Sequence, residues 1–132
     1  MPDLVIDTHI AIWRLTEPQN LSAAAESAVD VAEANGLIYV SAITIVELVY
    51  LTEKGKIPID VLHLLRGALD DPATAYQLTD ISRAIADAVG SIPRSTVPDM
   101  PDRIIAATAL QMNLPLVTAD HQIQASGIHT IW

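Results

Sequence analysis

Four acidic residues occupy positions at which a parallel β-sheet could bring them together. Asp7 ends the apolar run LVID, Asp120 follows the apolar run at 116–118, Glu47 comes shortly after LIYVS, and Asp102 opens the helical segment DRIIAATALQMN. In open parallel sheets, ligands bind beyond the carboxyl ends of the strands. We therefore expect these four side chains to share one site.

Four carboxylates in one site repel one another, and such groups either keep protons or bind a cation. Asp7 is the hardest to explain otherwise, because an acid at the inner end of an apolar strand pays a desolvation cost unless it is paired, hydrogen-bonded or metal-bound. The sequence has no cysteine, and its four histidines form no cluster. Oxygen ligands alone favour Mg²⁺ or Mn²⁺ over zinc.

Structural explanations exist for three of the acids taken singly. Asp102 is suited to the N-cap or first turn of its helix, where the helix dipole favours an acid. The segment TIVE, from Thr44 to Glu47, matches a capping box. Asp120 could cap a helix that begins at HQIQ. If the four acidic side chains lie together in the fold, a ligand role is favoured over a purely capping role.

Polar residues beside the acids are candidates for orienting them. Thr8, Ser41 and Thr118 flank the acidic positions and could hydrogen-bond a ligating carboxylate or a phosphate, or serve as caps and strand ends. His9 lies two residues after Asp7 and could orient a carboxylate, or could be a half-buried packing residue.

The loop before the last long helix and the first turn of that helix add three further candidates. Asp99 lies between Pro98 and Pro101, which favour extended or turn geometry, and is a candidate for orienting a ligand or for serving as an alternate ligand outside the helix. Arg94 and Arg103 are the basic residues nearest to the acids in sequence. Each is either a phosphate contact or an ordinary surface or ion-pair residue.

The elements that would position these residues alternate between strand and helix. Ser22 and Thr79 are suited to cap helices, and Gly36 and Gly55 to end them. This alternation predicts a three-layer α/β/α sandwich with a mostly parallel sheet, as one domain over 1–132. The expected strands are 4–7, 37–41, 75–78, 116–118 and 128–132, and the expected helices are 8–15, 23–35, 43–56, 59–69, 80–92 and 102–113.

Composition narrows the class of protein. A chain of 132 residues with 51% hydrophobic residues can bury the core of one domain. Its longest apolar run is broken by Ser41, Thr44 and Glu47, so we expect no membrane span, and the N-terminus lacks the pattern of a secretory signal. The absence of cysteine excludes disulfides and fits the cytoplasm.

The charge balance limits how the protein could bind a polyanion. Seven Lys and Arg against 16 Asp and Glu give a net charge of −9, which argues against a broad basic surface for nucleic acid. Aromatic residues are 4% of the chain, too few for an extended base-stacking platform. If the substrate is RNA, metal ions must offset much of the repulsion.

Four segments in order resemble the motifs of the PIN-domain family, and in particular the toxin nucleases of VapBC toxin–antitoxin systems. They are VIDTH, VSAITIVEL, DMPDRIIAATAL and LPLVTAD, and the terminal TIW is similar to that of a VapC-like subgroup with the DTH opening. The third segment departs from that subgroup. It reads TVPDMPD, without the His and Arg that often precede DPAD there.

The resemblance implies a five-stranded parallel sheet and a metal-dependent endoribonuclease whose acidic quartet is Asp7, Glu47, Asp102 and Asp120. Asp7 and Asp102 would bind Mg²⁺ or Mn²⁺ directly, Glu47 would bind the ion or orient water, and Asp120 would bind a second ion or act through water. The ions would activate a water for in-line attack on a phosphodiester. The products would carry 5′-phosphate and 3′-hydroxyl ends.

The resemblance also implies partners. A VapB-like antitoxin would place its C-terminal segment over the site, with an Arg or Lys among the acids, and a chain of net charge −9 suits a basic partner. A homodimer is implied as well, and the apolar segment VLHLL is a candidate contact.

Other classes remain as alternatives. The first is a PIN-fold interaction module that no longer cleaves, although four retained acids weigh against it. An aspartyl-nucleophile phosphatase would need an acid two residues after Asp7, where this chain has His9. A receiver domain would need an acidic pair after the first strand and a Lys after the last, and neither is present.

Overall fold

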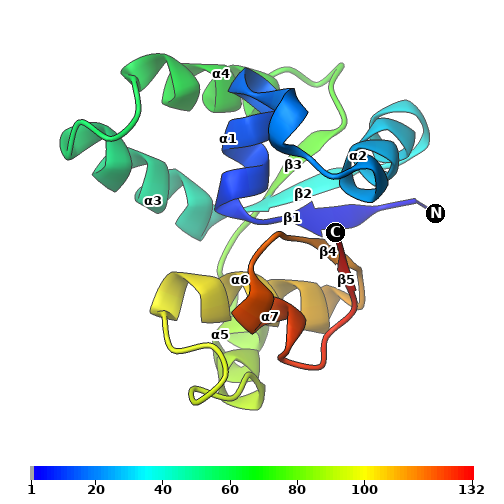
Figure 1. The fold of residues 1–132 in the computed structure, drawn as a ribbon, viewed down its shortest axis with the longest axis vertical. Coiled ribbons are helices and arrows are strands. Elements are labelled where there is room, and N and C mark those ends of the chain that lie inside the picture. Colours follow the sequence, from blue (N-terminus) through cyan, green and yellow to red (C-terminus); the bar gives the residue numbers. More distant parts are fainter. Residues whose placement is uncertain (1) are drawn as a thin grey trace.

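One five-stranded sheet forms the centre of the molecule. The structure is a computed structural model that describes residues 2–132 (Figure 1). The strand order is β3-β2-β1-β4-β5, and every neighbouring pair is parallel. The predicted sandwich is confirmed, with an all-parallel sheet in place of a mostly parallel one. The strands are β1 (Leu4–Ile6), β2 (Ile38–Ser41), β3 (Tyr76–Thr79), β4 (Leu116–Val117) and β5 (Thr130–Ile131).

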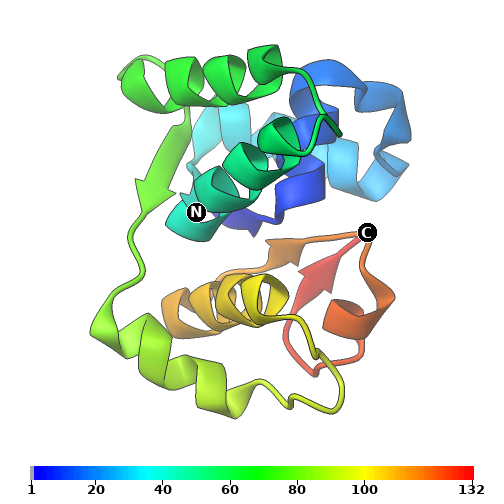
Figure 2. The same ribbon diagram turned by 90° about the vertical axis from the view of Figure 1, so that its left-hand side faces the viewer.

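Helices cover both faces of this sheet (Figures 1 and 2). One layer contains α1 (Thr8–Thr16), the 3₁₀ turn η1 (Pro18–Asn20), α2 (Ala23–Asn35), α3 (Ala42–Glu53) and α4 (Ile59–Asp70). The other contains α5 (Arg83–Ala88), the 3₁₀ turn η2 (Val89–Ser91), α6 (Met100–Met112) and α7 (His121–Gln124). None of the helices in residues 2–132 has the length and apolar character needed to cross a membrane.

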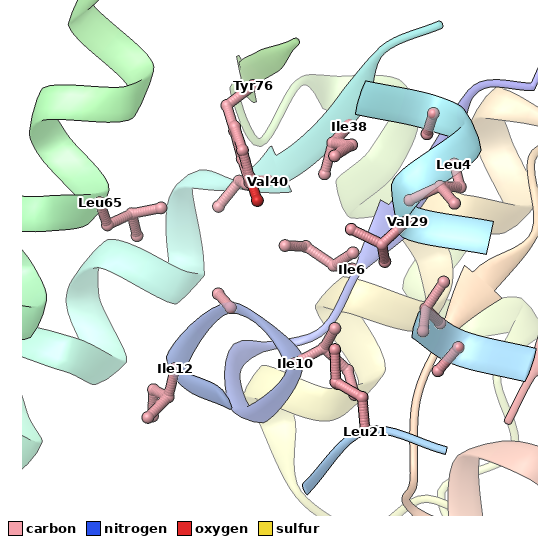
Figure 3. Packing of buried hydrophobic residues seen from close by; sticks show 14 of the residues in the cluster. Leu4, Ile6, Ile10, Ile12, Leu21, Val29, Ile38, Val40, Leu65 and Tyr76 are labelled. Carbon is pink, nitrogen blue, oxygen red and sulfur yellow. The ribbon is translucent and has the colours of Figure 1, made fainter. Parts of the chain in front are cut away.

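The alternation of β1 explains why both faces are covered. Successive side chains of a strand point to opposite faces. Leu4 and Ile6 belong to the core between the sheet and the α1–α4 layer (Figure 3), whereas Val5 belongs to the core under α5–α7. All three are at most 2% exposed. An all-apolar strand is therefore buried on both sides, as its sequence predicts.

The sheet has a topological switch point between β1 and β4. The connections from β1 to β2 and from β2 to β3 run through α1–α4, and those from β3 to β4 and from β4 to β5 run through α5–α7. Because the helices that follow β1 and β4 leave toward opposite faces, a crevice opens beyond these two strands. Asp7 and Thr118 are the residues that directly follow them.

The predicted helix 80–92 begins and ends at the wrong residues. Thr79 is the last residue of β3, and Ser82 caps the next helix by accepting a hydrogen bond from Ile85 N at 3.2 Å. That helix ends at Ala88, so 80–92 is not one continuous helix. The capping box at Thr44 is also wrong, because α3 begins earlier, after Ser41.

The last long helix begins two residues earlier than predicted. Met100 and Pro101 form its first turn, and proline fits there because the first amides of a helix have no intrahelical acceptor. Asp99 occupies the N-cap position, but its side chain makes no capping hydrogen bond. Asp102 therefore lies in the first turn, and its carboxylate is not the helix cap.

Candidate active site

A cavity of about 630 Å³ opens at the carboxyl end of the sheet. All four predicted acids line it, although they come from four separate segments of the chain. Asp99, Thr8 and His9 line it too, so the structure brings together seven of the eleven predicted site residues. The lining consists of Asp7, Thr8, His9, Trp13, Glu47, Asp99, Met100, Pro101, Asp102, Ala119 and Asp120.

Asp7 is held rigidly at the floor of the switch-point crevice. It is only 6% exposed. Its Oδ1 accepts a hydrogen bond from Ile10 N at 3.0 Å and so caps α1, and its Oδ2 accepts a short one from Thr118 Oγ1. Burial raises the pKa of Asp7 despite the lowering effect of these two bonds. The side chain therefore caps a helix and faces the cavity at the same time.

Glu47 is fixed by a chain of hydroxyl groups. Thr8 Oγ1 donates to Glu47 Oε1 at 2.5 Å, and Thr8 Oγ1 and Thr44 Oγ1 lie 3.0 Å apart. Since the single Thr8 proton goes to Glu47, Thr44 must donate to Thr8. Burial raises the pKa of Glu47, and the bond from Thr8 opposes that shift. Thr8 thus acts as the predicted orienting residue.

Asp102 is destabilised in its charged form by burial and by its acidic neighbours. Burial, followed by the charges of Asp120, Glu47, Asp99 and Asp7, raises its pKa to about 7. No hydrogen bond to its carboxylate offsets this repulsion within residues 2–132. A half-buried carboxylate close to four others is unfavourable when charged. Such a group is stabilised when it takes up a proton or binds a cation.

Asp120 combines a capping role with its place in the cavity. Its Oδ1 accepts hydrogen bonds from Gln122 N at 2.8 Å and from Ile123 N at 3.1 Å, as the capping interpretation predicts for α7. Its own amide donates to Thr118 Oγ1 at 3.0 Å. The Thr118 hydroxyl therefore joins Asp120 to Asp7 and fixes the two acids of the switch point relative to each other.

Four predicted residues lie outside the cavity lining, and one of them, Arg94, is exposed in the loop before α6. Thr118 contacts the site only through the bonds just described. Ser41 is buried and caps α3 through a bond from Ile43 N at 3.2 Å. The guanidinium of Arg103 donates to the carbonyl oxygens of Val89 and Ile92 at 2.9–3.2 Å. Arg103 therefore anchors η2 to α6.

Sequence reasoning missed four cavity residues, namely Trp13, Met100, Pro101 and Ala119. Trp13 lies one helical turn after His9 on α1, and that spacing was the available signal. Met100 is 63% exposed at the start of α6. These residues add apolar and aromatic surface to an otherwise acidic cavity.

The donor chemistry of the cavity fits a hard divalent cation. Its five carboxylates offer oxygen ligands, the type that Mg²⁺ and Mn²⁺ prefer, and none of the described lining residues is a Lys or Arg. Within residues 2–132 no three carboxylate or imidazole groups are close enough to chelate one ion as they stand. The fit is thus one of charge and ligand type.

Solved structures share this fold. A VapBC2 complex from Rickettsia felis, bound to a DNA fragment from its promoter, matches with a TM-score of 0.73 and 18% identity over 97% of this chain and 96% of the other. A toxin–antitoxin complex from Klebsiella pneumoniae matches with a TM-score of 0.68 and 23% identity over 98% and 96% of the two chains. At these identities the likeness concerns the fold.

Sequence comparison establishes the family. Ribonuclease VapC22 of Mycobacterium tuberculosis is 32% identical over 125 residues, which are 95% of this chain and 92% of that protein. The family model of the PIN domain matches residues 4–127, a range that contains all five acids of the cavity. The chain therefore belongs to the PIN-domain family and is a VapC-like member of it.

Proposed function

We propose that this chain is a metal-dependent endoribonuclease that serves as the toxin of a toxin–antitoxin pair. The observation that carries the proposal is the convergence of Asp7, Glu47, Asp102 and Asp120 on one cavity at the switch point of the sheet. The 32% identity to a protein named as a VapC ribonuclease supports the choice of RNA as substrate.

The hydrogen bonds and the electrostatic environment of each acid indicate its role. Asp7 and Asp102 would bind the metal directly, because Asp7 is fixed by two hydrogen bonds and Asp102 lies among four other carboxylates with its pKa raised to about 7. Glu47, oriented by Thr8, would bind the ion or hold the attacking water, and Asp120 would act on a second ion or through water. The metal, when bound, acidifies that water and stabilises the charge on the phosphate.

Metal removal tests this function directly. Purified protein should cleave a structured RNA with Mn²⁺ or Mg²⁺, stop in excess EDTA, and resume when Mn²⁺ is restored, because five carboxylates without a cation repel the phosphate backbone. Cleavage is followed by gel electrophoresis of an end-labelled RNA. Ligation of a 5′-phosphate-dependent adaptor checks the product ends.

A contaminating nuclease is the main confounder in that experiment. The control is the Asp7→Asn variant, purified in the same way and in the same yield. Cleavage that persists in this variant, or that ignores EDTA, would rule out the proposed function. Failure of the wild type to bind Mn²⁺ by calorimetry would support the idle interaction module instead.

An antitoxin and a second copy of the chain are the proposed protein partners, and the cytoplasm is the proposed location. A chain of net charge −9, whose cavity lining as described has five carboxylates and no Lys or Arg, suits a basic segment that inserts an Arg or Lys. The VLHLL segment offers little to a dimer, since Val61, Leu62 and Leu65 are buried and only Leu64 is 49% exposed.

Both partners can be tested by mass. Co-expression with the neighbouring reading frame should yield a stable complex without RNA cleavage, and light scattering of the isolated chain at micromolar concentration should give twice the 14.2 kDa protomer mass. A monomer in the second measurement would contradict the dimer. A complex that still cleaves RNA would contradict neutralisation at the acidic cavity.

A further inference from the structure

Three aromatic rings lie in a row at the edge of the acidic cavity. The rings of His9 and Trp13, one turn apart on α1, have centroids 5.9 Å apart and planes inclined by 57°. The ring of Trp132, directly after β5, lies 6.0 Å from that of Trp13 with an inclination of 44°. His9 and Trp13 line the cavity itself. The row thus joins the first helix to the edge strand.

This aromatic row keeps ring surface in contact with water. His9 is exposed, and Trp132 is 39% exposed. Both tryptophans of the chain are in the row. Burying the surface of an aromatic ring lowers the free energy of the system. A ligand that covers the exposed rings beside the cavity would therefore bind more tightly.

The acidic character of this protein means that affinity for RNA must come largely from contacts other than ion pairs. Most RNA-binding surfaces gain affinity from Lys and Arg contacts to phosphates. Here the net charge is −9, and the described lining of the cavity contains five carboxylates and no Lys or Arg. Stacking of a base on an aromatic ring does not depend on positive charge and tolerates any base.

We propose that the aromatic row of His9, Trp13 and Trp132 binds an unpaired nucleobase of the RNA strand that enters the acidic cavity. This inference rests on the proposed function and specifies its substrate class. A base can stack on a protein ring only where it has left the stack of its own strand. The protein therefore prefers single-stranded or loop nucleotides beside the scissile phosphate to continuous duplex.

Trp132 is the residue to substitute, because it is more exposed than Trp13 and lies outside the cavity lining. Trp132→Leu keeps an apolar side chain and removes the aromatic face, and Trp132→Phe keeps a smaller face. The probe is a 12-nucleotide oligouridylate, titrated into the cleavage-deficient Asp102→Asn protein while tryptophan fluorescence is followed. The same strand annealed to oligoadenylate provides the duplex comparison.

Single-stranded RNA should quench the fluorescence and the duplex should not. Trp132→Leu should weaken binding about tenfold, as expected for the loss of one stacked base, and Trp132→Phe should lose less. In the cleaving protein, Trp132→Leu should raise KM and leave kcat nearly unchanged. Val31→Ala, which shortens an exposed apolar side chain on α2, is the matched control and should bind as the wild type does.

Three results would overturn the inference. The first is equal quenching by the single strand and the duplex. The second is an unchanged dissociation constant for RNA in a Trp132→Leu protein whose melting temperature is also unchanged. The third is a Trp132→Leu protein that still binds RNA as the wild type does but no longer binds its protein partner. The two proposals fail separately. Metal-dependent cleavage with no effect of Trp132→Leu refutes the stacking surface alone, whereas ring quenching without any cleavage refutes the nuclease alone.

Discussion

Replacing Asp102 with asparagine should abolish RNA cleavage and at the same time make the metal-free protein more stable. The loss of activity should be on the order of 100-fold or more, because the change removes a charged ligand from the cavity. The gain in stability follows from the pKa of about 7, which burial and four neighbouring carboxylates impose on Asp102.

The sign of the stability change can be worked out from that pKa. A raised pKa means that the folded protein favours protonated Asp102 more than the unfolded chain does, so the cost of ionised Asp102 builds up as the pH rises from 3.8 to about 7 and is present in full above that. Asparagine carries no such charge. Asp102 is only half-buried, so solvent screening reduces the gain to about 1 kcal/mol, or a few degrees in Tm.

Thermal melts at pH 8 in EDTA and in Mn²⁺ measure this effect. The wild type should gain stability from Mn²⁺, and Asp102→Asn should gain much less. Asp80→Asn is the matched control, since Asp80 is exposed and outside the cavity and the change in net charge is the same. An Asp102→Asn protein that is less stable than the wild type in EDTA would show that the carboxylate supports the fold.

Replacing Arg103 with methionine should destabilise the protein by about 2–3 kcal/mol. The guanidinium makes three hydrogen bonds to the carbonyl oxygens of Val89 and Ile92, and bonds from a charged donor are among the stronger ones. Methionine keeps the apolar stem and leaves these acceptors without their donor. Arg103→Lys should recover part of the loss, because one ammonium cannot reproduce the planar fork.

Urea denaturation separates this role from the phosphate contact that the sequence suggests for Arg103. The control is Arg94→Met, because Arg94 is exposed in the loop before α6 and its loss should change stability by less than about 0.5 kcal/mol. Unchanged stability of Arg103→Met together with weaker RNA binding would restore the substrate-contact interpretation.

Four of the five acids of the cavity could be found from sequence because three of them adjoin a strand end or a helix start, and Glu47 follows β2 within two helical turns. Asp7 is the clearest case. Strand β1 is buried on both sides, so a carboxylate at its end has a desolvation cost that needs a hydrogen-bond partner or a cation to offset it. The role of Arg103 could not be found in this way. Neighbouring residues on a helix point about 100° apart, so a residue next to Asp102 in sequence faces a different surface.

Contacts between distant segments account for the rest of what sequence patterns missed. The pairing of Trp13 with Trp132 depends on how β5 lies beside β4, and no local pattern encodes that register. The start of α6 was misplaced because Pro98 and Pro101 suggest a loop, whereas the second of them fits the first turn of a helix. Short-range rules cannot distinguish these two uses of proline.

The hydrogen bond from Thr118 to Asp7 also makes the site depend on one very short strand. These residues are 111 positions apart in the chain. Thr118 directly follows the two-residue strand β4, and the pairing of β4 with β1 brings its hydroxyl to Asp7. Residues 2–112 alone therefore contain Asp7 but neither Asp120 nor the hydroxyl that joins the two acids. A substitution that weakens the pairing of β4 with β1 should therefore disturb the site from outside the cavity lining.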